Sequence, residues 1–540
     1  MTQTVPTDDE RERGREARDQ EDRWYPHAHG EQCWFPTGIA WNSHFWHSGL
    51  VTTTPELPVD RRISGHRLGS VLGAWQRPGP AYVALADAVR AAILSGTVPL
   101  STRLPSEREL ADATGVSRTT TTATYGLLRD EGYLVSRRGS GTVTTLPAGP
   151  GARSSMAETS RAEPGIVDLA MAAPSAPSSL HGAYLAALDA LPRHLTGTGY
   201  APLGLPVLRE AIARWYTLRG TPTTPDQVLV TTGAQQAIHL LVSAHAGPGD
   251  RVVVEHPTYP HAIDVVRSAG ARAVPVPSGE SGLDIDLLES TLRQVAPRLV
   301  YLIPSHRNPT GTSLSDEDAA RVRALARRHR TTIVGDEVLA ELTMDGPAPG
   351  SFAGDATSGA GSAYVVSLGS ASKSYWGGLR VGWVRAHPDL VHRIATARAH
   401  VDIGTALLEQ LVVAELLTHS DELLAGRRAA LRDRRDLLVG LLRDQLPSWR
   451  FEVPAGGLSL WADLGAPASS ALAAISTRYG VRVVPGTAFG VDGSFERNLR
   501  LPFTSTADDL RRAVSGLADA WAGLGVTEPA ATPAAVHAMV

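Results

Sequence analysis

The pattern of apolar and polar positions predicts two helices in the first third of the chain. Between Tyr82 and Leu94, apolar residues recur at spacings of three and four, which is typical of an amphipathic helix, and Gly96 is a favourable helix end. In the sequence LPSEREL that follows, Ser106 and Glu109 have the spacing of a capping box. A second helix is therefore expected to begin after Ser106.

A third helix and a hairpin are predicted next. Ser117 is a favourable helix cap and Gly132 a favourable helix end, so the residues between them are expected to be helical. The runs YLVSRR (133–138) and TVTT (142–145) then have the character of two short strands joined by a glycine turn. Three helices followed by such a hairpin outline a winged helix-turn-helix, which we assign to residues 76–146.

The pattern changes beyond residue 165. Five apolar runs alternate with helical stretches: QVLVTT, RVVVEH, LVYLIP, TTIVGDE and AYVVSLGS. Nearly continuous apolar strands that alternate with helices indicate a parallel sheet covered on both faces. We therefore predict an α/β domain over residues 166–524, which a linker rich in Pro, Gly and Ser at 147–165 separates from the winged helix.

The two ends of the chain carry little apolar pattern. Residues 1–24 are densely charged, which predicts disorder, and the stretch to residue 65 holds tryptophans without a clear period. This stretch is either a docking segment or sequence upstream of the true start, and we treat residues 1–75 as an extension. The tail at 525–540 is rich in Ala and Pro and is expected to be frayed.

Composition narrows the class of protein. The chain has 540 residues, of which 43% are hydrophobic, so it can form more than one core. With the single cysteine Cys33 no intramolecular disulfide is possible, and no apolar run is long enough to span a membrane. The net charge of −4 gives no overall basic signature. We expect a multidomain cytoplasmic protein without a membrane partner or a metal site.

One residue departs from a strong compositional bias. The chain holds 51 Lys and Arg residues, and Lys373 is the single lysine among them. Arginine stays protonated at physiological pH, whereas a buried lysine can lose its proton and form a Schiff base with a carbonyl compound. The alternative is that Lys373 has no special role and remains by chance in a sequence whose codon usage favours arginine. The residues around Lys373 distinguish these two explanations.

Those surroundings have the chemistry of a cofactor site. Lys373 follows a buried strand and is expected at the carboxyl edge of the sheet, where open α/β folds place ligands. TTGAQQA (231–237) turns from a strand into a helix whose free amides can hold a phosphate. Asp336 ends another strand, and Arg380 lies on a glycine-rich turn. Together these groups suit a phosphorylated aldehyde with a basic ring nitrogen.

Eight motifs in the same order make residues 165–520 similar to the fold-type I pyridoxal-5′-phosphate (PLP) enzymes of the aspartate aminotransferase family. They are YAPLGLPVLREAIARWYTLRG, TTGAQQA, EHPTYP, PSHRNPTG, GDE, SASKSYWGGLRVGW, PAGGLSLW and NLRLPF. The preceding domain resembles a GntR-type winged helix in LPSERELADATGVSRTT and GSGT. Both domains in this order resemble a MocR-type transcription regulator.

The resemblance implies roles for five residues around the cofactor ring. Lys373 would hold PLP as the internal aldimine, and Asp336 would pair with the pyridine nitrogen and keep it protonated. Asn308 would donate a hydrogen bond to the ring oxygen, and Tyr259 would stack on the ring face. Arg500 matches the arginine that binds an α-carboxylate in aminotransferases, which implies a small amine or amino-acid effector.

The resemblance also implies a phosphate site and a dimer. Ala234 and Gln235 at the helix start, Ser370 and Arg380 would hold the phosphate of PLP. Tyr200 matches a residue that reaches the site from a partner subunit, so a homodimer is expected.

One departure bears on activity. The tyrosine that such proteins usually carry two or three residues after the aspartate is missing, because Val338 and Leu339 stand there. The loss of one hydrogen bond to the ring oxygen is expected to weaken turnover more than binding. We therefore favour a PLP-dependent regulator that senses an amine, an amino acid or PLP itself, and the alternative is an active aminotransferase with an accessory DNA-binding domain.

The winged helix is expected to bind double-stranded operator DNA through its helix starts and its wing, where Arg137 adds to a basic cluster. Gly139 would let the wing approach the minor groove, and the threonine run at 119–122 suits a surface that uses its hydroxyls. Thr122 replaces the basic residue that the family has four positions after the first recognition arginine. The residues that the resemblance places on DNA are Arg103, Arg108, Arg118, Thr119, Thr120, Arg138 and Gly141.

Overall fold

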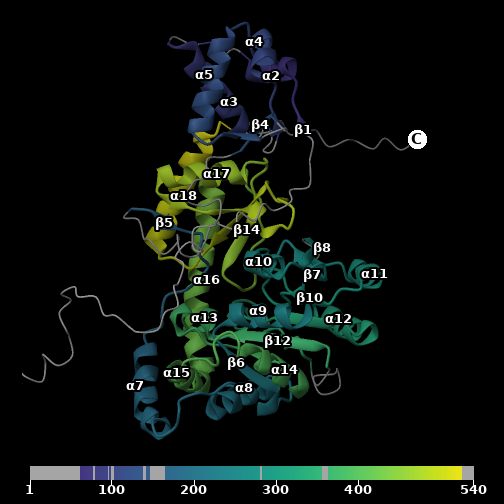
Figure 1. The fold of residues 1–540 in the computed structure, drawn as a ribbon. Helices are drawn as coiled ribbons and strands as arrows, with labels where there is room; N and C mark the ends of the chain where they lie inside the picture. Colours follow the sequence, from purple (N-terminus) through teal and green to yellow (C-terminus); the bar gives the residue numbers. More distant parts are fainter. Residues whose placement is uncertain are drawn as a thin grey trace, which may run out of the picture. The chain divides into compact units, whose positions relative to one another are not determined.

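The computed structural model describes residues 61–73, 75–76, 79–94, 97–98, 102–137, 141–145, 165–279, 282–354 and 363–525 (Figure 1). Several of the sequence assignments lie outside these ranges. They are the extension up to residue 60 with Cys33, the helix end at Gly96, the wing residues Arg138 and Gly139, the linker up to residue 164 and the tail from residue 526. In the described part of the chain, no helix is both long and apolar enough to cross a membrane.

The winged-helix unit forms the first described part of the chain, drawn in purple and blue in Figure 1. Its sheet has the strand order β1-β2-β4-β3. Its elements are β1 (Arg61–Arg62), α2 (Gly65–Leu72), α3 (Ala81–Leu94), β2 (Thr102–Arg103), α4 (Glu107–Thr114), α5 (Arg118–Asp130), β3 (Leu134–Arg137) and β4 (Gly141–Thr144). The predicted three helices and hairpin are all present.

Local capping explains where the helices of this unit begin. The Ser106 hydroxyl accepts from the Glu109 amide at 3.3 Å, and the Glu109 carboxylate accepts from the Ser106 amide at 2.7 Å, which is the predicted capping box. Ser117 caps α5 through the Thr120 amide at 3.1 Å. Gly132 follows α5 with φ of 78°, a conformation that glycine adopts without strain. Short-range sequence chemistry therefore fixes the helix-turn-helix.

The structure adds two elements to this unit that the sequence assigned to the extension. β1 pairs in parallel with β2, and α2 packs on α4. Leu68 and Leu72 of α2 are buried in the same core as Leu85, Leu110 and Leu128. Residues 61–72 thus supply one side of the winged-helix core.

The sheet of the large domain has eight strands in the order β6-β13-β12-β11-β10-β7-β8-β9. They are β6 (Val228–Thr231), β7 (Arg251–His256), β8 (Arg272–Gly279), β9 (Gly282–Leu283), β10 (Leu299–Leu302), β11 (Thr332–Asp336), β12 (Val365–Ser370) and β13 (Gly382–Arg385). The five predicted strands β6, β7, β10, β11 and β12 all run in the same direction, which confirms the expected parallel arrangement. The sequence analysis did not identify β13, which runs antiparallel to both β12 and β6, or β9, which runs antiparallel to β8. The chain reverses after Lys373 within a short glycine-rich turn, and such a turn can join only antiparallel strands.

Helices cover both faces of this sheet, as the apolar strands predict. In β10, Leu299 and Tyr301 belong to the core shared with α9, α10 and α14, whereas Val300 and Leu302 belong to the core shared with α11 and α12. A third core joins α7, α8 and α15 to β6 and β13. The helices are α7 (Leu180–Ala190), α8 (Pro206–Leu218), α9 (Ala234–His245), α10 (Pro260–Ser268), α11 (Ile285–Val295), α12 (Asp316–His329), α14 (Pro388–Arg398) and α15 (Leu407–Thr418).

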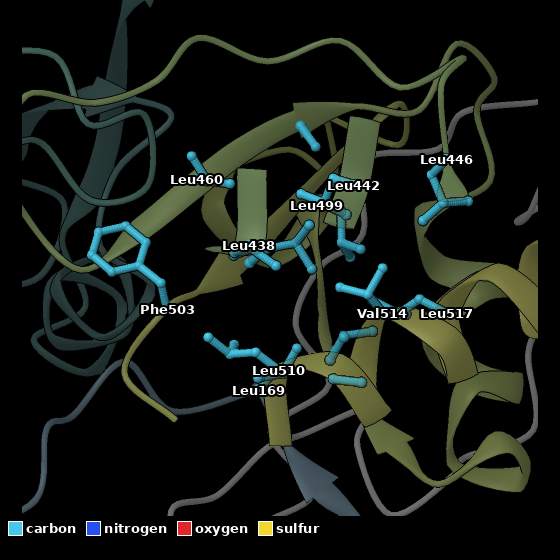
Figure 2. Close-up of a cluster of buried hydrophobic side chains, with 14 of the residues drawn as sticks. Leu169, Leu438, Leu442, Leu446, Leu460, Leu499, Phe503, Leu510, Val514 and Leu517 are labelled. Atoms are coloured by element: carbon cyan, nitrogen blue, oxygen red, sulfur yellow. The ribbon is translucent and has the colours of Figure 1, made fainter. Parts of the chain in front are cut away.

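The small domain contains a three-stranded sheet, β14-β17-β16, beside a separate pairing of β15 with β5. Its elements are β5 (Val167–Asp168), α16 (Ser420–Gln445), β14 (Ser459–Asp463), α17 (Ser469–Ser476), β15 (Val481–Arg482), β16 (Val484–Pro485), β17 (Asn498–Pro502) and α18 (Ala507–Gly523). Figure 2 shows Leu438 and Leu442 of α16 gathered with Leu499 of β17 and Val514 of α18. Leu169 lies in the same core, so the segment that follows the linker is anchored in this domain.

Candidate functional site

The end of β12 places the single lysine. All six residues of β12 are buried, and Ser370 caps the short helix α13 (Ala371–Ser374) by accepting from the Ser372 amide at 3.2 Å. The Lys373 ammonium donates to the Ala172 carbonyl at 2.7 Å. Burial, helped by the nearby cations Arg500 and Arg380, lowers the pKa of Lys373 to about 8. A large fraction of this amine is therefore unprotonated at mildly alkaline pH.

Asp336 ends β11 beside this lysine. One carboxylate oxygen accepts from the Tyr301 hydroxyl at 2.6 Å, and the other accepts from the Val338 amide at 3.1 Å. Burial raises the pKa of Asp336, while these two hydrogen bonds and the charge of Lys373 act against that shift. A buried carboxylate of this kind is suited to hold a proton on a basic ring nitrogen.

The turn between β6 and α9 forms a cradle of backbone amides. α9 begins at Ala234 without a side-chain cap, and Gly233 before it has φ of 84°. A Cβ atom on Gly382 would lie 2.7 Å from the Ala234 nitrogen, so only glycine permits β13 to pass this close. Arg380 donates to the Thr232 carbonyl at 3.2 Å. The predicted helix start and the predicted arginine thus lie at one place.

The side chains around the cradle differ in whether they already have hydrogen-bond partners. Ser370, the predicted phosphate ligand, donates to the Val381 carbonyl at 3.2 Å and caps α13. The sequence analysis did not identify Ser372. Its buried hydroxyl has no hydrogen-bond partner among the described residues, and the buried amide oxygen of Gln235 also lacks one. Buried polar atoms are normally paired, so both groups are available to a ligand. The position of Ser372 directly before the lysine was the signal that could have identified it.

Arg500 lies on β17 and is buried against the site. One of its terminal nitrogens donates to Asn308 Oδ1 at 3.4 Å, the other donates to the Ala170 carbonyl, and its Nε has no partner among the described residues. Its guanidinium lies 5.0 Å from the centre of the Phe489 ring. Burial lowers the pKa of Arg500 to about 10, so it remains a cation at neutral pH. The structure therefore brings together Arg500 and Asn308, which are far apart in the sequence.

Two predicted tyrosines have contrasting surroundings. Tyr259 directly precedes α10, and burial together with the charge of Asp336 raises the pKa of its hydroxyl to about 12. Its ring contacts His261 edge to face with 5.3 Å between ring centres. Tyr200 is 70% exposed, so most of its side chain is left uncovered by the residues that the structure describes.

Tyr301 is the other functional residue that the sequence analysis missed. It lies inside the apolar run LVYLIP, where an inward-facing tyrosine cannot be told from an ordinary core residue, yet its hydroxyl contacts the Asp336 carboxylate. Only the register of β10 against β11, in which Tyr301 pairs with Val334, brings the two groups together.

We predict that Tyr301→Phe weakens PLP binding by about 1.5 to 3 kcal/mol, because Asp336 loses a hydrogen bond to a charged acceptor. Titration of the PLP-free protein with PLP measures the change. Tyr125→Phe is the matched control, since it removes another buried tyrosine hydroxyl, which donates to the Pro105 carbonyl at 2.8 Å in the winged-helix unit. An unchanged PLP affinity in Tyr301→Phe would contradict a role for this hydrogen bond.

The DNA-binding candidates lie mainly at the helix starts of the winged-helix unit. Arg108 in the first turn of α4 and Arg118 at the start of α5 are exposed, and so is Thr119. Thr120 is half-buried, and its hydroxyl contacts that of Ser117 at 2.8 Å.

The expectation that the whole threonine run offers surface hydroxyls is wrong for Thr121. This side chain is fully buried, and its hydroxyl donates to the Glu107 carbonyl at 2.9 Å. The Thr122 hydroxyl donates to the Glu107 carboxylate at 2.6 Å. In the wing, Gly141 has φ of 80°, and a Cβ atom there would lie 2.8 Å from Nε of Arg103. Arg103 is therefore held beneath the wing on β2 and is only half-exposed.

Comparison with known proteins agrees with this arrangement. A family model described as aminotransferase class I and II matches residues 167–517. The chain belongs to this family. Residues 81–143 match a second model, described as bacterial regulatory proteins of the gntR family. The aminotransferase family member described here thus carries a GntR-type DNA-binding domain before its aminotransferase domain.

Relatives include both enzymes and regulators. The chain is 34% identical to 2-aminoadipate transaminase of Thermus thermophilus over 331 residues, which are 60% of this chain and 80% of that protein. It is 31% identical over 399 residues to the probable rhizopine catabolism regulatory protein MocR of Rhizobium meliloti, covering 68% of this chain and 78% of the relative. The predicted resemblance to MocR-type regulators is confirmed.

A solved structure shows the same fold. LysN, the alpha-aminoadipate aminotransferase of Thermus thermophilus, complexed with N-(5'-phosphopyridoxyl)-L-leucine, is 31% identical to this chain. The match has a TM-score of 0.62 and covers 67% of this chain and 93% of LysN. The fold-type I aminotransferase architecture predicted for the second domain is confirmed.

The cofactor that this fold implies is pyridoxal phosphate, and the residues present fit it. The Gln235 amide oxygen, the Ser372 hydroxyl and Nε of Arg500 are buried polar atoms that lack a hydrogen-bond partner among the described residues. The lysine has a lowered pKa, and a buried carboxylate lies near it. A phosphorylated ring that carries a carbonyl and a basic nitrogen would use this donor set.

Proposed function

We propose that this aminotransferase family member is a PLP-dependent transcription regulator, in which the aminotransferase-like domain holds PLP on Lys373 and senses a small amine or amino acid while the winged-helix domain binds operator DNA. The observation that carries the proposal is the single lysine of the chain, buried near Asp336, in a protein that also carries a GntR-type domain at residues 81–143. A DNA partner also implies a cytoplasmic location.

Each residue around Lys373 would have a distinct role in binding PLP. PLP supplies a carbonyl that reacts reversibly with amines and a ring that withdraws electrons. Lys373 provides the attacking amine, and Asp336 keeps the ring nitrogen protonated. The amides at Ala234 and Gln235, with Ser370, Ser372 and Arg380 around them, would hold the phosphate. Asn308 would donate to the ring oxygen, and Tyr259 would cover one ring face.

Arg500 would recognise the effector. Among the described residues its buried Nε has no hydrogen-bond partner, and the Nη2 atom beside it donates only to a neutral backbone carbonyl, that of Ala170. A carboxylate accepts two parallel hydrogen bonds from one edge of a guanidinium and would replace that carbonyl. The proposed effector is therefore an amine that also carries a carboxylate.

We further propose that the protein acts as a homodimer. Tyr200 is 70% exposed, and it matches a residue that reaches the partner's site in this family. Leu185 and Leu188 on α7 are also exposed large apolar residues, as an interface would require. Light scattering of the PLP-loaded protein should give twice the chain mass of 57.2 kDa. A stable monomer with full PLP occupancy would contradict the dimer.

An active aminotransferase is the second candidate, favoured by the intact Arg500 and by the transaminases among the relatives. Against it, Val338 and Leu339 stand where such proteins usually carry the tyrosine that contacts the ring oxygen, and the Val338 amide donates to Asp336 instead. The test is to mix PLP-loaded protein with an excess of carboxylate-bearing amines and a 2-oxo acid. The regulator hypothesis predicts a change in the visible spectrum without sustained product formation. Many turnovers per site would favour the enzyme.

For the DNA-binding half, Arg118→Ala is expected to weaken operator binding by about 1 to 3 kcal/mol if this exposed arginine reads a base through two hydrogen bonds. PLP content should not change. Fluorescence anisotropy with a duplex selected from a random pool measures the effect, and binding should fall steeply with salt. Arg129→Ala, at the far end of the same helix, is the matched control. Parent-like affinity in Arg118→Ala would show that the recognition helix has been assigned wrongly.

A further inference from the structure

A second cleft lies at the edge of the large sheet opposite to Lys373. Lys373 follows the last residue of β12, whereas this cleft is lined by Tyr364 just before the first residue of β12 and by Thr332 at the start of β11. Its volume is about 780 Å³, which lies within the range of small-molecule sites. The ends of α9, α11 and α12 and the first half of α14 complete its wall.

The cleft is strongly cationic in a protein whose net charge is −4. Four arginines line it against a single acid, Asp389. The arginines are Arg293, Arg298, Arg330 and Arg393. The cleft therefore has an excess of positive side chains over carboxylates.

The seam between α11 and α12 shows that the imbalance is local. Along this seam Arg321 pairs with Asp286 at 2.5 Å and Arg328 pairs with Glu289 at 2.7 Å. These ion pairs between α11 and α12 do not continue to the cleft. Arg293 lies in the last turn of α11 and Arg330 follows α12, and neither has a carboxylate partner among the residues that the structure describes.

Histidines provide polar atoms deeper in the cleft. Nδ1 of His245 lies 2.8 Å from the Leu241 carbonyl, so this nitrogen carries the proton and Nε2 is left to accept from Arg393 at 3.3 Å. Arg393 thus donates to a neutral imidazole ring, which does not neutralise the positive charge of its guanidinium. Nε2 of His329 is buried and has no hydrogen-bond partner in the described part of the chain.

Helix dipoles account for only part of this arrangement. Cations near the carboxyl ends of α11 and α12 are stabilised by the helix dipoles, which explains the positions of Arg293 and of Arg330 taken one at a time. The dipoles do not explain Arg393 on α14, whereas Arg298, which precedes β10, is already paired with Asp250 at 3.2 Å. They also leave the buried His329 nitrogen unsatisfied.

We propose that this cleft is a second ligand site, which binds a small molecule bearing one or more phosphate groups. Guanidinium groups match phosphate oxygens through paired hydrogen bonds, and several arginines around one hollow favour a ligand with more than one negative charge. The exposed side chains of Ala296 and Ala363 provide apolar surface at the rim for an organic body. The site is independent of Lys373 and does not rest on the regulator hypothesis.

Calorimetric titration of PLP-loaded protein with inorganic pyrophosphate tests the proposal, because PLP already occupies the phosphate cradle near Lys373. Parent protein should bind about one pyrophosphate per chain, and the double variant Arg293→Glu, Arg330→Glu should lose at least about tenfold in affinity, since each such loss corresponds to 1.4 kcal/mol. Arg478→Glu, another exposed arginine at the end of a short helix, should bind as the parent does.

Three outcomes would overturn the proposal. The first is that parent protein gives no saturable binding of pyrophosphate. The second is that the double variant keeps parent affinity while its circular dichroism spectrum is unchanged. The third is that a short random duplex displaces pyrophosphate from the Arg118→Ala protein, which would assign the cleft to nucleic acid.

Discussion

Lys373→Arg should abolish the visible absorption band of the Schiff base at every PLP concentration. The side chain that replaces lysine keeps the positive charge and most of the length, but it cannot supply a deprotonated primary amine. In the parent protein, burial and the neighbouring cations lower the pKa of Lys373 to about 8, so the reactive form is accessible. The fold and the basal affinity for DNA should be retained, because α13 is far in sequence from the winged-helix unit and its cap uses Ser370.

The composition of the chain makes this experiment unusually selective. Lys373 is the single lysine, so reduction of the PLP-loaded protein with borohydride can label only this residue and the amino terminus. The phosphopyridoxyl label should appear on the peptide that contains SASK. A band that persists in Lys373→Arg, or a label found only at the amino terminus, would contradict the assignment.

Gly382→Ala is the second substitution expected to have a large effect. A Cβ atom there would lie 2.6 Å from the Gly233 carbonyl carbon and 2.7 Å from the Ala234 nitrogen, both of which are backbone atoms that cannot rotate away. Gly382 pairs with Ser370 on one side and Thr231 on the other, so the strain falls on the phosphate cradle and on the strand that carries Lys373. We expect destabilisation of about 1 to 3 kcal/mol and at least a tenfold loss of PLP affinity.

Gly377→Ala provides the matched control in the glycine-rich turn that leads into β13. A Cβ atom on Gly377 has nothing within 4 Å, and its φ is not in the left-handed region. Thermal unfolding and PLP titration of both variants separate a steric effect at the cradle from a general sensitivity of the glycine-rich turn. Equal behaviour of the two variants would refute the close approach of β13 to the start of α9.

The features that the sequence predicted well depend on short-range chemistry. Ser106 with Glu109 is a capping box whatever the rest of the fold does. Lys373 and Asp336 each follow a buried apolar run, and parallel strands necessarily bring their carboxyl ends to one edge. The outline of the winged helix and the edge that carries the cofactor site were therefore accessible from local pattern.

The features that the sequence did not predict depend on long-range register. Tyr301 contacts Asp336 only because β10 lies beside β11, and its run of apolar neighbours resembles any core strand. The antiparallel direction of β13 follows from a turn between Lys373 and Gly382 that apolar periodicity does not reveal. The threonine run, a poor helix interior by composition, was expected to form a surface that uses its hydroxyls, yet α5 turns Thr121 toward the Glu107 carbonyl.

The central claim is that chemistry at Lys373 changes DNA binding, and one titration tests it directly. PLP-loaded protein bound to a fluorescent operator duplex is titrated with carboxylate-bearing amines, while visible absorbance and DNA anisotropy are recorded in the same sample. We predict an amine that changes both signals with a single midpoint, and no response of anisotropy in Lys373→Arg. The opposite result is that every reacting amine completes the absorbance change while the affinity for DNA stays the same. That result would contradict the claim that chemistry at Lys373 changes DNA binding.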